Sequence, residues 1–81
     1  MATLNITYNG LSSDLPLELD GHVSDVDVRR IAVEVVRSGG APGLHISNLR
    51  EDAFVHYVVD RFRGPWGDER IYLRPKLPFG A

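Results

Sequence analysis

Hydrophobic and polar residues alternate along two stretches near the start of the chain. In residues 3–8 the apolar side chains occupy every even position, and in residues 15–19 leucines occupy every odd position. This period of two predicts two half-buried strands. The Asn9-Gly10 pair between them favours a hairpin, with a loop that we expect to be longer than these two residues. Pro16 cannot donate a hydrogen bond to a neighbouring strand, so we place the second strand at a sheet edge.

A helical pattern with start and end signals follows these strands. Ser24 is a favourable N-cap residue, and Asp27 suits the first turn of the helix that it would begin. Gly39 or Gly40 can adopt the left-handed conformation that ends a helix. Between these signals the apolar residues recur at the spacing of one helix face. The predicted stripe that faces the core consists of Val28, Ile31, Ala32 and Val35.

The second half of the chain reads as strands separated by turns rich in glycine and proline. We predict a short strand at residues 44–46, the longest strand at 54–62, a hairpin loop at 63–69 and a last strand at 70–74. Neither face of residues 54–62 is uniformly polar, so the pattern does not assign which face meets the helix. We expect one α+β domain over residues 1–74, with a two-layer mixed sheet of four to five strands packed on one helix. Residues 75–81 should form an extended C-terminal tail.

The order of these elements resembles the ubiquitin-like β-grasp superfamily (ββαββ) over nearly the whole chain. The resemblance rests on element order and size, carried by residues 4–8, 15–19, the helix and residues 70–74. It implies that the first and last strands lie parallel at the centre of the sheet. Members that act as modifiers or carriers end in Gly-Gly, whereas this chain ends Pro78-Phe79-Gly80-Ala81. The resemblance therefore implies a binding module more strongly than a conjugated one, although trimming after Gly80 would leave a free glycine carboxylate.

Composition narrows the possible classes of function. The 81 residues include no cysteine, which excludes disulfides and thiolate sites. We expect a soluble cytoplasmic protein without membrane contact, because no apolar run approaches the roughly 18 residues of a membrane span. The net charge is −2, with five acidic and no basic residues in positions 1–28. Residues 29–81 carry all nine basic residues and six acidic ones. This positive surplus is too small and too spread out for the clustered basic surface expected of a nucleic-acid-binding protein. The chain should be a monomer or a weak homo-oligomer.

Catalytic and metal chemistry find little support in the sequence. The three histidines, His22, His45 and His56, are too far apart in sequence to match a metal motif. The serines stand in turn and cap contexts, and no nucleophile elbow of the Gly-x-Ser-x-Gly type is present. We therefore expect a protein that is not an enzyme and that needs no metal or cofactor.

The predicted hairpin loop near the C-terminus is the best candidate for a binding site. It holds the only tryptophan of the chain, and tryptophan and arginine dominate the hot spots of protein interfaces. Trp66 can either dock a partner protein or fold back over the small core, and both interpretations stay open. The candidate protein-binding residues are Arg61, Phe62, Arg63, Trp66 and Arg70, with Leu77, Phe79 and Gly80 as candidates in the tail.

The leading hypothesis is thus a noncatalytic protein-binding or assembly module. One alternative is single-stranded nucleic-acid binding, in which aromatic residues including Tyr72 stack on bases and basic residues including Lys76 contact phosphates. Nucleic acid is not favoured, because Asp60, Asp68 and Glu69 in the same stretch would repel phosphate. A further alternative is ubiquitin-like modifier or carrier chemistry through the C-terminal tail.

Overall fold

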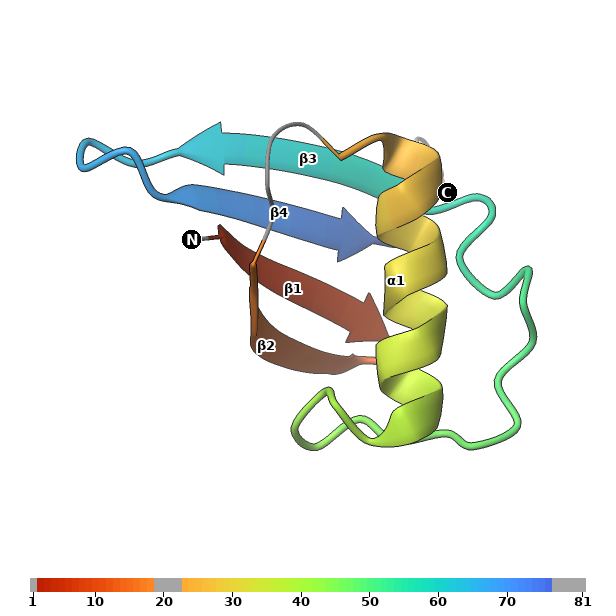
Figure 1. Ribbon diagram of the computed structural model, residues 1–81. Coiled ribbons are helices and arrows are strands. Elements are labelled where there is room, and N and C mark those ends of the chain that lie inside the picture. Colours follow the sequence, from red (N-terminus) through yellow and green to blue (C-terminus); the bar gives the residue numbers. More distant parts are fainter. Residues whose placement is uncertain (1, 19–22, 77–81) are drawn as a thin grey trace.

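The computed structural model describes residues 2–18 and 23–76, which form an α+β fold (Figure 1). One helix packs on an open mixed sheet of four strands. This confirms the predicted α+β class with one helix on a mixed sheet. The elements in chain order are β1 (Ala2–Tyr8), β2 (Leu11–Leu17), α1 (Asp25–Ser38), β3 (Val58–Arg63) and β4 (Glu69–Arg74).

Strands β1 and β2 form a hairpin that is tighter than the sequence suggested. Tyr8 pairs directly with Leu11, so the turn consists of Asn9 and Gly10 alone. Both turn residues have positive φ angles, 50° and 79°, as a type I′ turn requires. The expectation of a longer loop was wrong, because this turn has the twist of the flanking strands and lets pairing begin at once.

The sheet has the strand order β2-β1-β4-β3. β1 and β4, the first and last strands, run parallel at its centre, as the resemblance implied. β2 is an edge strand and contains Pro16, as predicted. One helix on a mixed sheet of this kind is compatible with a β-grasp-like fold.

The helix begins and ends where its sequence signals predict. The Ser24 hydroxyl accepts a hydrogen bond from the amide of Asp27 at 3.2 Å, and Gly39 adopts a φ of 85° and donates to the Val35 carbonyl. The predicted core stripe was only partly right. Val28 and Ala32 are buried, whereas Ile31 and Val35 are partly exposed. Val33 and Val36 are the other buried residues of the helix. The buried face is therefore turned away from the predicted stripe, toward the segment that follows the helix.

Residues 40–57 form an irregular segment that closes one end of the core. The predicted strand at 44–46 and the first part of the predicted strand at 54–62 were wrong, because residues 51–56 form turns and β3 begins at Val58. The apolar residues here act as separate anchors rather than as one face of a strand. Leu44, Leu49 and Phe54 are each at most 4% exposed. The Phe54 ring meets the rings of Tyr8 and Tyr57 edge-on, with centroids 5.7 and 4.8 Å away.

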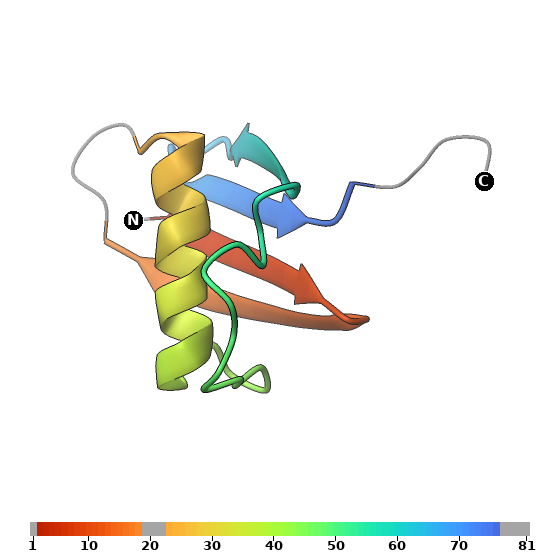
Figure 2. The ribbon, with the colours of Figure 1, turned by 90° about the vertical axis from the view of Figure 1, so that its right-hand side faces the viewer.

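The two faces of the sheet are different. α1 lies against one face, as Figure 2 shows, and the alternating residues Leu4, Ile6, Ile71 and Leu73 on that face are fully buried. The opposite face carries the intervening residues of each strand and is not covered by any helix of the described part of the chain. The open face is therefore the part of the sheet where side chains of all four strands can contribute to an exposed surface.

Candidate binding surface on the β3–β4 hairpin

Strand alternation divides the candidate residues between the two faces of the sheet. Phe62 and Arg70 are direct cross-strand partners on the open face. Arg61 lies on the helix side, where its guanidinium is 2.8 Å from the Asp25 carboxylate in the first turn of α1. Arg63 shares the face of Arg61, because successive side chains of a strand point in opposite directions. The predicted cluster therefore does not form as one patch.

Tyr72 is the residue that completes the open-face group. Its ring meets Phe62 edge-on, with a centroid distance of 5.5 Å and an interplanar angle of 77°. The Arg70 Nε donates to the Tyr72 hydroxyl at 3.0 Å, and the guanidinium carbon lies 5.7 Å from the ring centroid. From the sequence we expected Tyr72 only to stack on bases. Its position two residues after Arg70 on one strand is the signal that places it on the same face.

Carboxylates on β2 and β3 form ion pairs with the arginines of this face. Arg74 forms an ion pair with Asp60, and Arg70 Nη2 lies 3.8 Å from an Asp14 oxygen. A hollow of about 310 Å³ lies between Phe62, Tyr72 and Arg74. The open face thus presents two aromatic rings beside arginines that already have counter-charges.

Trp66 is in the loop between β3 and β4. Figure 1 shows this loop at the end of the sheet away from α1. Trp66 is 91% exposed, and Phe62 is 58% exposed. This excludes the interpretation in which Trp66 folds back over the core.

The loop that carries Trp66 has a closed conformation. The Gly64 amide donates to the Asp68 carbonyl at 2.7 Å, and the Gly67 amide donates to the Gly64 carbonyl at 3.1 Å. The Asp68 carboxylate occupies the space that a Cβ at residue 64 would need, so a larger residue there would displace this exposed side chain. Gly67 has a φ of 83°, which favours glycine. Trp66 is therefore presented by a defined turn.

Metal binding finds no support in residues 2–18 and 23–76. No group of three or more His, Cys, Asp or Glu side chains in these ranges could hold a metal ion. His45 and His56 are exposed, and His45 Nε2 lies 3.1 Å from the Arg37 carbonyl. His22 and the tail candidates Leu77, Phe79 and Gly80 lie outside the described residues.

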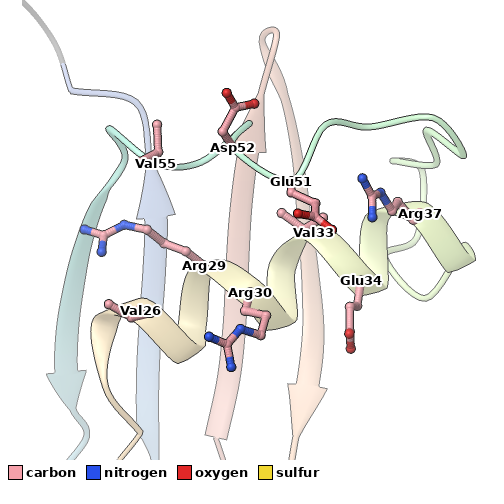
Figure 3. A pocket seen from close by; sticks show the side chains of 9 residues that line it. All are labelled: Val26, Arg29, Arg30, Val33, Glu34, Arg37, Glu51, Asp52 and Val55. Carbon is pink, nitrogen blue, oxygen red and sulfur yellow. The ribbon is translucent and has the colours of Figure 1, made fainter.

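A second hollow, which the sequence did not reveal, runs along α1. This groove has a volume of about 520 Å³. Figure 3 shows its lining side chains on the helix and on residues 51–55. Val26 and Val55, both more than half exposed, contribute apolar surface. Arg29 donates two hydrogen bonds to the Tyr57 carbonyl, and Arg37 Nε donates to the Leu49 carbonyl. These two arginines thus fasten the irregular segment to the helix.

Comparison with known proteins gives no relative. No protein-family model matches the chain, and no curated protein or solved structure matches it either. The described residues include no helix with the length and apolar character needed to span a bilayer.

Proposed function

We propose that this protein is a noncatalytic binding or assembly module whose partner is another protein. Its binding surface would consist of Trp66 at the hairpin tip together with Phe62, Arg70 and Tyr72 on the open face. The observation that carries the proposal is the 91% exposure of Trp66 on a closed, hydrogen-bonded turn.

The physical argument concerns what an exposed, fixed aromatic side chain can contribute. Docking an aromatic ring buries about 150–250 Å² of surface. The turn around Trp66 is already closed by the bonds of Gly64 and Gly67, so little backbone freedom would be lost on binding. Phe62, 58% exposed on the adjoining strand, extends the apolar surface. Tryptophan, tyrosine and arginine together form the usual composition of an interface hot spot.

The proposed module belongs to the ubiquitin-like β-grasp class. The parallel pairing of β1 with β4 at the sheet centre, with α1 across one face, supports this proposal. The class hosts many functions, so the argument for binding rests on the surface and not on the fold. Modifier chemistry through the tail stays an alternative, since it depends on residues outside the described ranges.

Single-stranded nucleic acid is the second candidate partner, because Phe62 and Tyr72 could stack on bases. The charges of this surface argue against nucleic-acid binding. Arg70 and Arg74 are matched by Asp14 and Asp60, and the chain has a net charge of −2. Titrating the tryptophan fluorescence with oligonucleotides at low and high salt separates the two partners. Quenching that weakens steeply with salt would favour nucleic acid over protein.

The decisive experiment compares two matched variants. Trp66→Ala should reduce capture of the native partner at least about 10-fold, as expected for a hot-spot residue. Leu11→Ala removes a side chain that is 54% exposed on the β1–β2 hairpin, away from the proposed surface, and should leave capture unchanged. Melting curves of both variants must match the wild type, so that loss of folding does not explain loss of binding.

A further inference from the structure

A row of four side chains crosses the open face from one edge of the sheet to the other. Asn5 on β1 lies opposite Asp14 on β2 and opposite Tyr72 on β4. Tyr72 in turn pairs with Asp60 on β3. Paired residues of neighbouring strands carry their side chains on the same face. The proposed binding surface on β3 and β4 therefore shares its face with polar side chains of the β1–β2 hairpin.

Arg70 connects this hairpin to the binding surface. Its Nη2 lies 3.8 Å from Asp14 Oδ1, and its Nε donates to the Tyr72 hydroxyl at 3.0 Å. β1 lies between β4 and β2, so the Arg70 side chain reaches across two strand spacings of about 4.8 Å each. The guanidinium thus contacts β2 at one end and Tyr72 at the other.

Asp14 is itself held in place by its neighbours. The Asn5 Nδ2 donates to Asp14 Oδ1 at 2.8 Å and to the Ser12 hydroxyl at 2.9 Å. The oxygen that accepts from Asn5 is the one that faces Arg70. The Arg70 and Asp14 side chains are 45% and 58% exposed, so their ion pair alone would contribute little. A network of several charges and hydrogen bonds restrains its members more than one such pair does.

We infer that Asp14 is a positioning residue for the proposed binding surface. Through Arg70 it restrains the Tyr72 hydroxyl, and the Tyr72 ring in turn meets Phe62 edge-on at a centroid distance of 5.5 Å. This inference rests on the proposed function. It adds a residue of β2 that would affect the affinity for the partner without touching the partner.

The physical reason is the loss of side-chain freedom on binding. Immobilising a side chain with many rotamers at an interface opposes association. Arg70 and Tyr72 lose less freedom if their conformations are restrained before the partner arrives. A guanidinium has five N–H donors, so the contacts of Arg70 with Asp14 and Tyr72 leave donors for a partner.

The first test is an NMR comparison that needs no partner. Asp14→Asn retains the size of the side chain and removes its charge. In ¹³C,¹⁵N-labelled protein, this change should shift the Arg70 Nε–H signal and weaken the nuclear Overhauser cross-peaks between the Phe62 and Tyr72 rings at least about 2-fold. Asp25→Asn is the matched control, because it removes the counter-charge of Arg61 on the helix face. The control should leave the Arg70 and ring signals unchanged.

The second test measures whether this positioning affects binding. Capture of the native partner is compared for the wild type, Asp14→Asn, Arg70→Gln and the double variant, with matching melting curves. Asp14→Asn should weaken capture by about 2-fold or more in the wild type. In the Arg70→Gln background it should have no further effect, because Asp14 acts through Arg70.

Three results would overturn the inference: unchanged Arg70 and ring signals in Asp14→Asn, the same changes in Asp25→Asn, or equal effects of Asp14→Asn on capture in both backgrounds. Each of them leaves the proposed function standing if Trp66→Ala still reduces capture of the native partner. If Trp66→Ala has no effect on capture, the proposed function itself fails.

Discussion

The Arg61 guanidinium on β3 lies 2.8 Å from the Asp25 carboxylate in the first turn of α1. The neighbouring residue in sequence, Phe62, points to the opposite face of the sheet and contacts Tyr72. One strand thus contributes both to the attachment of the helix and to the proposed binding surface. The division follows from the period of two along a strand.

The Arg61–Asp25 ion pair should contribute modestly to stability. The Arg61 side chain is 23% exposed and that of Asp25 is 53% exposed, so solvent weakens their attraction. A double-mutant cycle with Arg61→Gln and Asp25→Asn, measured by urea denaturation, should give a coupling free energy of about 0.2–1 kcal/mol that falls with added salt. The more exposed Arg50–Asp52 pair is the control and should give less. A coupling above about 2 kcal/mol would contradict this view of the pair.

Phe54 should be a major source of stability although it lies outside regular structure. It is 1% exposed and packs against Tyr8 and Tyr57. Phe54→Ala should reduce the free energy of unfolding by about 3–5 kcal/mol, a large part of what a domain of this size possesses. The matched change His56→Ala, at an exposed position of the same turn segment, should alter it by less than about 0.5 kcal/mol. Equal effects of the two changes in urea denaturation would show that the segment is not anchored by Phe54.

Stability should fall in alkaline solution partly because of Tyr57. Burial, with a smaller contribution from Tyr8, raises the pKa of Tyr57 above its ordinary value of 10.0. The folded protein therefore holds this proton more tightly than the unfolded chain does. The resulting stability is fully present below pH 10 and is lost as the pH rises through the folded-state pKa.

Tyr57→Phe isolates this contribution. The variant retains an aromatic ring against Phe54 and removes the titrating hydroxyl. Urea denaturation at a series of pH values should show a smaller loss of stability above pH 10 for the variant than for the wild type. Parallel curves for the two proteins would show that the Tyr57 hydroxyl has no part in the alkaline transition.

The features that sequence reasoning predicted well are determined by neighbouring residues. Ser24 and Gly39 act through hydrogen bonds within a helical turn, so their roles can be inferred locally. The alternation in β1 reports burial of one face directly. Pro16 marks an edge because it lacks a donor, whatever the rest of the fold is. Each of these predictions is confirmed.

The features that were missed depend on contacts between distant parts of the chain. Phe54 has the residue type of a strand, and only its packing against Tyr8 makes it an anchor in a loop. The two sets of alternating residues in β3 can be identified from the sequence, but each set contains both apolar and charged residues. Arg61 can lie on the helix side because its counter-charge, Asp25, is there. Phe62, Trp66 and Arg70 were named from the sequence as candidates, but their arrangement, with Arg61 and Arg63 on the other face, depends on the fold.

The role of the Trp66 hairpin is tested by measuring partner capture by wild-type protein, Trp66→Ala and Leu11→Ala at equal concentrations of folded protein. Trp66 is exposed, so its removal should change the free energy of unfolding by no more than about 0.5 kcal/mol. We expect Trp66→Ala to reduce the affinity for the native partner at least about 10-fold, whereas Leu11→Ala should bind like the wild type. Equal capture by all three proteins would contradict the central claim that the Trp66 hairpin is the binding surface.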